Sequence, residues 1–390
     1  MNLIKFLILG VLTALLFPPF FILPLGFLIF PLFYFHVKSL NKSCSYLYYF
    51  INGFIYSLGF FSLYLIWIRN PFLVNELSKN YTYFSFLLIF TISFIFGILF
   101  ILFKYFRFSK YDIFLIPLFF IIFEMIIANL WHGFPWISFS LILSNNFIGS
   151  ALLYLFGSYG AGYILINIFL LPVYFLNFSN SIKKLRTKII FFTILLSAFL
   201  FYSLPKLDFY GKQVRNINVD LVQLNFPLVN NISSEKKYIE IVNIIKNSDA
   251  ELIIFSENNL PFIVDDLKKI EISKYLKSNQ KIIIGATRKE NNNYFNSLIF
   301  IKNNHIDVFD KKILVPFGEF VPFRNLINFM NIIAGSTDFK IGSKARYIEI
   351  DNEINFIPVI CYEIIFFWKL ISNKNLHSDL IVNITNDSWF

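Results

Sequence analysis

The feature that most constrains this chain is the uneven distribution of its acidic residues. Residues 1–204 hold only three of the 24 acidic residues, Glu76, Asp112 and Glu124. This half is instead built from long apolar segments, most of which approach the roughly 20 residues that a helix needs to cross a bilayer. These segments run from 3–20, 23–36, 47–68, 83–103, 112–131, 149–176 and 188–204. The sequence therefore predicts a polytopic α-helical membrane region of about seven helices over residues 1–204.

Residues 205–390 have a different composition and are predicted to form a separate domain, with the boundary near Pro205. The whole chain has 390 residues and a formal net charge of +10. The first half contributes +9 of that charge, because it holds 12 basic and three acidic residues. All of these basic residues except Lys5 lie in short loops between apolar segments, where membrane orientation explains them. We therefore exclude nucleic acid as a partner.

The basic residues of the loops predict the orientation in the membrane. Loops 37–46, 104–111 and 177–188 carry nine of them, whereas the alternate loops carry only Arg69 and Lys79. Because positive loops stay in the cytoplasm, the N-terminus is expected to be cytoplasmic. The first segment lacks the small-residue site of a cleaved signal peptide. Seven spans would then place residues 205–390 outside, which is the periplasm for a protein of the bacterial inner membrane.

Two features of the membrane half have a structural and a functional interpretation. Glu124 lies inside the fifth apolar segment, where a carboxylate is costly and often functional. The alternative is a structural hydrogen bond to a neighbouring helix, and we favour that interpretation. Trp136 ends the motif Gly133-Phe134-Pro135-Trp136, which is typical of an interfacial anchor and is also a candidate contact for substrate.

The second half alternates short apolar strands with helical stretches, which predicts an α/β layered domain. Strands are expected at 218–224, 252–255, 282–285, 295–302, 305–309, 357–360 and 380–384. Helices are expected at 233–247, at 264–278 and directly after Cys361. Reactive side chains gather where the strands of such sheets end.

Three residues at predicted strand ends suggest acyl transfer: Glu257, Lys311 and Cys361. A thiol becomes nucleophilic through a lowered pKa or an adjacent base, and we expect Cys361 to have both. A helix N-terminus would favour its thiolate, Glu257 would act as general base, and Lys311 would stabilise a tetrahedral oxyanion. The alternative is two surface charges and a buried thiol.

Further residues surround these three in the sequence. Glu319 and Glu363 are acids that either pair with a nearby lysine or orient Lys311 or the incoming group. Residues 322–339 are densely apolar and form either a core helix or, as we favour, a lid that dips into the bilayer. Candidate lid residues are Phe323, Phe329 and Met330. The four histidines show no metal-ligand spacing, and the two cysteines, Cys44 and Cys361, give no disulfide framework.

Several motifs resemble those of bacterial apolipoprotein N-acyltransferases, a membrane-anchored branch of the nitrilase (carbon–nitrogen hydrolase) superfamily. They are Phe17-Pro18-Pro19, Glu124, Gly133-Phe134-Pro135-Trp136, Ile253-Ile254-Phe255-Ser256-Glu257, Lys311 to Glu319, Ile360-Cys361-Tyr362-Glu363 and Thr385 to Phe390. The resemblance implies an αββα, nitrilase-like extracytoplasmic domain. It implies Glu257 as general base, Lys311 as oxyanion-stabilising lysine and Cys361 as nucleophile. It also implies supporting roles for Glu319, Tyr362, Glu363 and Trp389.

The resemblance further implies a two-step reaction without a cofactor. Cys361 takes an acyl chain from a phospholipid, typically phosphatidylethanolamine, and a lysophospholipid leaves. The α-amino group of a diacylglyceryl-cysteine apolipoprotein then attacks the thioester, which completes lipoprotein maturation. Alternatives are a membrane-anchored amidase or nitrilase, for which the spans and lid would be superfluous, and a transporter or receptor, which would not need Cys361.

The chain departs from the family pattern in several places. Phe255-Ser256 stands where Trp-Pro is usual, Ile127 where an arginine is usual, and Phe309 where a tyrosine is usual. The sequence also stops at Trp389-Phe390, inside a motif that continues with glycine in the family. We therefore expect a C-terminally incomplete catalytic domain, without its final strands and last transmembrane helix. A chain of this length is expected to be poorly folded in its last third and inactive.

Overall fold

The computed structural model describes residues 2–386 apart from 41, 74–75, 107–111, 146, 178–215, 225–231, 268–269, 304, 327–330, 332–334 and 336. The chain divides into two compact units. The first comprises Met1–Arg69 and Thr82–Gly211, and the second comprises Asn70–Tyr81 and Lys212–Phe390. The predicted boundary near Pro205 and the predicted segment 188–204 lie outside the described residues.

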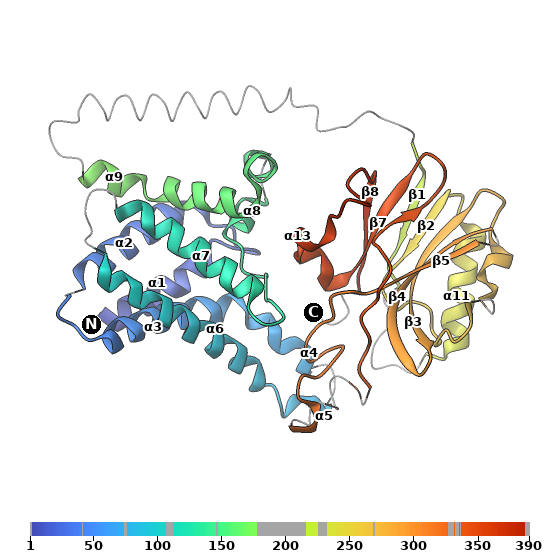
Figure 1. The fold of residues 1–390 in the computed structure, drawn as a ribbon, viewed down its shortest axis with the longest axis horizontal. Coiled ribbons are helices and arrows are strands. Elements are labelled where there is room, and N and C mark those ends of the chain that lie inside the picture. Colours follow the sequence, from blue (N-terminus) through green and yellow to red (C-terminus); the bar gives the residue numbers. More distant parts are fainter. Residues whose placement is uncertain are drawn as a thin grey trace. The chain divides into compact units, whose positions relative to one another are not determined.

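The first unit is helical (Figure 1). Its main helices are α1 (Asn2–Ala14), α2 (Gly26–Ser39), α3 (Tyr46–Tyr64), α6 (Phe84–Phe100), α7 (Leu115–Asn129), α8 (Phe147–Phe169) and α9 (Leu171–Asn177). Close packing of α1 on α3 depends on glycine, since a Cβ on Gly10 would lie 2.0 Å from the carbonyl oxygen of Tyr56. Buried phenylalanine and tyrosine rings fill the interior of this unit. The helices confirm the predicted helical region.

Two helices of the described residues are long and apolar enough to cross a membrane, Phe84–Tyr105 and Gly149–Phe169. A third candidate is the pair Tyr46–Tyr64 and Ile66–Leu73, which bends by 63°. The apolar helices Leu3–Ala14, Leu23–Ser39 and Leu115–Asn129 are shorter. Six of the seven predicted segments are therefore helical, but only two or three reach spanning length within the described residues.

Glu124 is buried on α7 and accepts a hydrogen bond from the backbone N–H of Phe139, at 3.0 Å. Trp136 packs edge-on against Trp67, with ring centroids 5.0 Å apart, and its carbonyl accepts from the hydroxyl of Tyr64. A buried carboxylate that is hydrogen-bonded in this way costs less than an unpaired one. The hydrogen bond of Glu124 agrees with its structural interpretation, whereas the interfacial role of Trp136 stays a prediction.

The second unit contains two sheets (Figure 1). The larger has the order β1-β2-β3-β4-β5, formed by β1 (Val219–Val222), β2 (Leu252–Phe255), β3 (Lys281–Glu290), β4 (Asn293–Lys302) and β5 (His305–Asp310). The pairs β1–β2 and β2–β3 are parallel, whereas the pairs β3–β4 and β4–β5 are antiparallel. The smaller sheet has the order β6-β7-β8, formed by β6 (Ile348–Glu349), β7 (Asn355–Ile360) and β8 (Leu380–Ile384).

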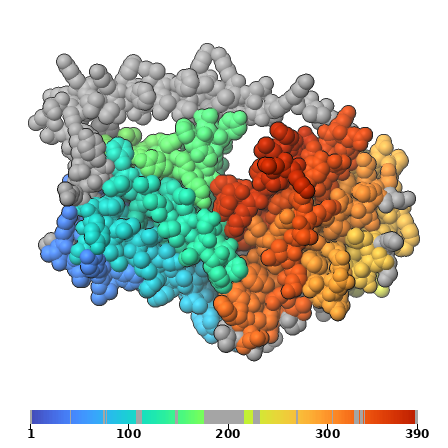
Figure 2. All heavy atoms as spheres, in the orientation of Figure 1, coloured from blue at the N-terminus to red at the C-terminus, as the bar shows by residue number. Residues whose placement is uncertain are grey.

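The two sheets pack face to face, with helices on their outer faces. Alternating residues of the larger sheet either pack against helix α11 (Ser234–Asn247) or join Phe356, Ile360 and Val382 of the smaller sheet. On the other side of β7, Ile357 and Val359 contact Leu370 of the short helix α13 (Phe367–Leu370). This is the predicted αββα order. In Figure 2 the later residues of the chain, orange to red, form most of the visible surface of this unit.

Two local predictions need correction, and one strand was not predicted. The described residues of 264–278 do not form the expected helix: Val264 bridges to Arg288, and among these residues only Glu271–Tyr275 forms a 3-10 turn. Strand β6 was not expected, because two residues are too short to show a period. The helix after Cys361 is a five-residue 3-10 turn, Cys361–Ile365, followed by α13. Short segments of this kind owe their form to tertiary packing rather than to intrinsic propensity.

Candidate active site

The predicted residues follow strands whose carboxyl ends meet at one edge of the sheet pair. Glu257 lies two residues after β2, Lys311 directly after β5, and Cys361 directly after β7. Strands β2, β3 and β5 run in the same direction, because two antiparallel steps separate β3 from β5. The structure therefore brings together residues that are 104 positions apart in the sequence, from Glu257 to Cys361.

Two carboxylates share one lysine and one asparagine. The ammonium Nζ of Lys311 lies 2.9 Å from Oε1 of Glu319 and 3.4 Å from Oε1 of Glu257. The side-chain nitrogen of Asn296, on β4, donates to the same two oxygens at 2.6 and 2.7 Å. The backbone N–H of Asn386 donates to Oε2 of Glu257, at 3.3 Å. These donors offset the repulsion between two like charges at short range.

Lys311 is held as a cation. Its side chain is almost completely buried, which by itself lowers the pKa of an ammonium. The carboxylates of Glu319 and Glu257 outweigh that effect, so the pKa of Lys311 is raised above its ordinary value. A buried cation that needs no change of protonation is suited to stabilising negative charge that develops on a substrate oxygen.

Cys361 occupies a strained position at the end of β7. Its φ of 52° lies in the left-handed region, which residues with a Cβ seldom adopt. The hydroxyl of Thr385 donates to its sulfur, at 3.4 Å. Burial and the negative charge of Glu257 raise the pKa of the Cys361 thiol to about 11, although Lys311 and Thr385 oppose the rise.

The expectation of a lowered thiol pKa is therefore wrong. The turn that follows Cys361 has only five residues and is 3-10, so it offers little of the dipole expected from a helix. The thiol is protonated at neutral pH and interacts with the carboxylate of Glu257. An arrangement of this kind can ionise the sulfur only by passing its proton to an adjacent base.

Glu363 is fully buried and faces the backbone rather than the thiol. Its carboxylate accepts from the N–H groups of Lys312, Ile313 and Ile360, at 2.7 to 3.0 Å, and pairs with Arg346. Tyr362 is also buried, with its ring against Phe366 at 5.0 Å, and burial raises the pKa of its hydroxyl. The second oxygen of Glu319 accepts from the N–H of Val315, at 2.8 Å.

The predicted lid is described only in part. Phe329, Met330 and Trp389 lie outside the described residues. Phe323 is 73% exposed and has a φ of 53°, so it is no core residue. Arg324 forms an ion pair with Asp338, which also accepts from the N–H of Val321 at 2.9 Å. These contacts join the two ends of segment 322–339.

Asn296 and Thr385 were not predicted as site residues. Asn296 lies within a strand that reads as ordinary alternation, and its amide gives no sequence signal of a function. Thr385 stands in the terminal motif and directly follows β8, so its position at a strand end could have identified it. Each contacts a predicted site residue only because strands distant in sequence are neighbours.

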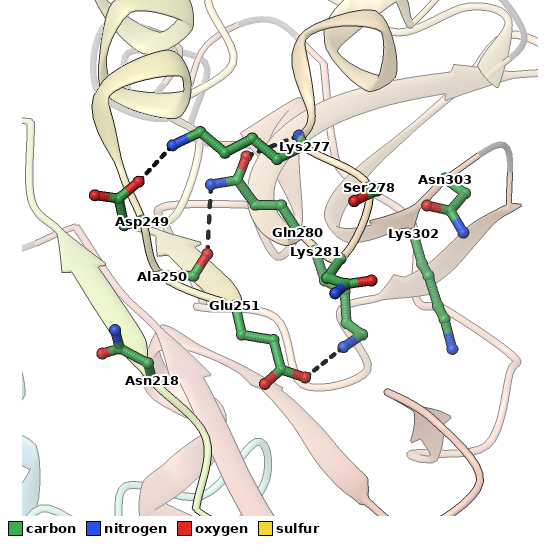
Figure 3. A pocket seen from close by; sticks show the side chains of 11 residues that line it. Asn218, Asp249, Ala250, Glu251, Lys277, Ser278, Gln280, Lys281, Lys302 and Asn303 are labelled. Atoms are coloured by element: carbon green, nitrogen blue, oxygen red, sulfur yellow. Dashed lines mark hydrogen bonds and ion pairs between the residues drawn. The ribbon is translucent and has the colours of Figure 1, made fainter.

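A cleft of about 730 Å³ lies at the opposite strand ends (Figure 3). Asn218, Glu251 and Lys281, which line it, stand at the beginning of β1, β2 and β3, whereas Glu257 follows the end of β2. Two ion pairs join charged groups of its lining: Lys281 with Glu251 at 2.8 Å, and Lys277 with Asp249 at 2.6 Å. The cleft is thus separate from the constellation around Cys361.

Known proteins resemble both parts of the chain. Residues 9–171 match the family model described as apolipoprotein N-acyltransferase N-terminal domain. Apolipoprotein N-acyltransferases from Rickettsia typhi, Wigglesworthia glossinidia brevipalpis and Rickettsia prowazekii are 28%, 28% and 26% identical, over 72%, 87% and 98% of this chain. The matches span 59%, 70% and 79% of those relatives, respectively.

Among solved structures, a CN-hydrolase superfamily protein from Xanthomonas campestris has a TM-score of 0.34 at 14% identity. That match covers 44% of this chain and 65% of the other. A glutamine-dependent NAD+ synthetase from Acinetobacter baumannii has a TM-score of 0.32 at 19% identity, covering 43% and 32%. Scores of this size do not establish a shared fold. The chain is therefore similar to apolipoprotein N-acyltransferases, both in the part that the family model matches and over most of its length in the aligned relatives.

Proposed function

We propose that the protein is an N-acyltransferase that moves a fatty acyl chain from a phospholipid to the N-terminal amine of diacylglyceryl-cysteine apolipoproteins. The observation that carries the proposal is the contact network of Glu257, Lys311 and Cys361. It supplies a base, a cation and a nucleophile in one place, which is what acyl transfer through a thioester requires. The named relatives support the choice of substrates.

In the first half-reaction, Glu257 takes the proton of the Cys361 thiol as the sulfur attacks the ester carbonyl of the phospholipid. A C–S bond forms, and Lys311 stabilises the negative charge on the carbonyl oxygen. The C–O bond to glycerol then breaks. The departing oxygen takes the proton back from Glu257, so that a lysophospholipid leaves and the acyl chain remains on Cys361.

In the second half-reaction, the α-amine of the apolipoprotein attacks the thioester carbonyl. Glu257 takes a proton from the nitrogen, and Lys311 again stabilises the oxyanion. The C–S bond breaks, the new amide leaves, and Glu257 returns the proton to the sulfur. Glu319 and Asn296 hold Lys311 and Glu257 in place through both halves.

The decisive experiment is to trap the acyl-enzyme. The purified membrane-embedded chain is incubated with phosphatidylethanolamine of one acyl composition, and Cys361 is analysed by mass spectrometry. The proposed function predicts an adduct with the mass of that acyl chain, which Cys361→Ser and Lys311→Met abolish and the cleft variant Lys277→Ala retains. An adduct would also overturn the expectation that residues 1–390 are inactive. Transfer to water instead of a lipopeptide amine would favour the hydrolase alternative.

We also propose that the first unit lies in the bacterial inner membrane, with the N-terminus in the cytoplasm and the second unit in the periplasm. The loop charges support this orientation. In intact spheroplasts, a membrane-impermeant maleimide should label Ile239→Cys, on the exposed face of α11, and should leave Cys44 unlabelled until the membrane is opened. Labelling of Cys44 from outside would reverse the proposed orientation.

A further inference from the structure

A buried ion pair connects the segment that carries Lys311 to the turn that carries Cys361. Arg346 is 5% exposed and Glu363 is fully buried. The two guanidinium nitrogens Nη2 and Nη1 of Arg346 lie 2.6 and 2.8 Å from Oε1 and Oε2 of Glu363. This two-point geometry fixes the orientation as well as the distance of the carboxylate.

The carboxylate of Glu363 binds backbone on both sides of the site. One oxygen accepts from the N–H groups of Lys312 and Ile313, which directly follow Lys311. The other accepts from the N–H of Ile360, which directly precedes Cys361. Lys312 and Ile313 follow the end of β5, which is in the larger sheet, whereas Ile360 is the last residue of β7, which is in the smaller. Glu363 therefore joins the two sheets where the nucleophile and the lysine leave them.

Arg346 is itself held from several directions. Its Nη1 donates to the carbonyl of Pro358 on β7, at 3.1 Å, and its guanidinium lies over the ring of Phe309 on β5, 5.0 Å from the ring centre. The amide of Asn375 donates to its backbone carbonyl, at 3.0 Å. The planar guanidinium of Arg346 stacks on an aromatic ring and also donates two hydrogen bonds to one carboxylate. The ammonium group of a lysine cannot make both kinds of contact equally well.

We propose that Arg346 is a positioning residue for the acyl transfer: by fixing Glu363, it sets the placement of Lys311 relative to Cys361. This positioning role depends on the proposed function only for the identity of the acyl donor. Lys311 has to reach the carbonyl oxygen at the moment when the sulfur attacks the carbon, so a small displacement between the two sheets weakens that contact. The base Glu257 leaves the larger sheet at β2 and does not touch this ion pair in the described contacts.

The test separates acylation from simple reactivity of the sulfur. Acylation of Cys361 by p-nitrophenyl butyrate needs an oxyanion contact, and the release of p-nitrophenol measures it whatever the natural donor is. Alkylation by iodoacetamide forms no oxyanion and depends on the ionisation of the thiol. Arg346→Met and Arg346→Lys are compared with wild type and with Lys344→Met, an exposed neighbour on the same segment, in the full membrane-embedded chain.

We expect Arg346→Met to lower kcat for acylation by about 10²-fold, on the order of the loss of an oxyanion donor, with little change in KM. Alkylation should fall by less than about fivefold, and Lys344→Met should behave as wild type. Arg346→Lys should recover part of the rate, to within roughly tenfold of wild type. If Arg346→Met does not fold, Arg346→Lys and Arg346→Met/Glu363→Gln carry the comparison.

Two results would overturn the inference. One is acylation by folded variants at position 346 that stays within about threefold of wild type. The other is an equal fall of acylation and alkylation, since that indicates a general structural role. A wild-type chain that reacts with p-nitrophenyl butyrate in an Arg346-dependent manner, but never with phospholipid, would refute the proposed donor and leave the positioning role intact.

Discussion

Lys311 lies closer to Glu319 than to Glu257, with Nζ–Oε1 distances of 2.9 and 3.4 Å. The carboxylate of Glu319 thus holds the cation, and Glu257 keeps its second oxygen for the backbone N–H of Asn386 and its approach to the thiol. The two acids have different surroundings and hence different tasks, although both contact the same ammonium.

Glu319→Gln should therefore impair the base as well as the lysine. Without Glu319, the buried Lys311 turns to Glu257, and a base that is firmly paired takes the thiol proton less readily. We expect the rate of thioester formation to fall by about 10²-fold, a typical effect of losing general-base catalysis. Stopped reactions analysed by mass spectrometry give the rate. A value close to that of wild type would show that Glu319 does not control the pairing.

The pH dependence of Cys361 gives a second prediction. Because its thiol pKa is raised to about 11, alkylation by iodoacetamide should still be accelerating above pH 9. Glu257→Gln removes a negative charge and should lower this pKa, whereas Lys311→Met should raise it. Rate against pH for the three proteins measures the shifts. A higher thiol pKa in Glu257→Gln, or a lower one in Lys311→Met, would mean that the carboxylate and the ammonium do not act on the sulfur as the structure indicates.

The same shift makes stability depend on pH. A folded-state pKa above the unfolded one means that the native state binds the proton more tightly. The contribution of Cys361 is therefore fully present below about pH 9 and is lost as the pH rises toward about 11. The free energy of unfolding can be measured by urea denaturation at a series of pH values. Between about pH 9 and 11 it should fall more steeply with pH for wild type than for Cys361→Ala, and below about pH 9 the two curves should be parallel.

Thr385 donates to the sulfur and should favour its thiolate. Thr385→Val keeps the shape and removes the donor, so we expect a higher thiol pKa and acylation slower by about tenfold, as for the loss of one hydrogen bond to a charged group. Thr385→Ser keeps the hydroxyl and should retain most of the rate. Equal behaviour of the valine and serine variants would argue against this hydrogen bond.

Gly285 gives room to the turn that carries Glu257. A Cβ at this position on β3 would lie 2.4 Å from the nitrogen of Asn258 and 2.6 Å from the Cα of Glu257. Gly285→Ala should displace the base and cost about 1–3 kcal/mol of stability, as overpacking does. Gly318→Ala is the steric control, since its nearest neighbour is a Val315 methyl at 3.3 Å. Gly285→Ala should have a lower thermal unfolding temperature and a slower rate of acylation than Gly318→Ala.

Strand positions in the second half were largely predictable, because buried strands show apolar runs bounded by polar residues. Strands 252–255 and 380–384 coincide with β2 and β8. The structure of segment 264–278 was not predictable. Its apolar residues have a helical spacing, but its described residues lie beside β3 and do not form a helix. Local spacing cannot distinguish these outcomes when the neighbouring sheet supplies the backbone partners.

The sequence by itself determined that the chain has an apolar helical half and an α/β half, and that Glu257, Lys311 and Cys361 follow strands. Periodicity and charge distribution carry that information locally. Only the tertiary structure decided that Glu319 holds Lys311, that Asn296 bridges the two acids, and that Arg346 fixes Glu363. It also reversed the expected pKa shift of Cys361, because burial and the charges that face a thiol depend on which strands become neighbours.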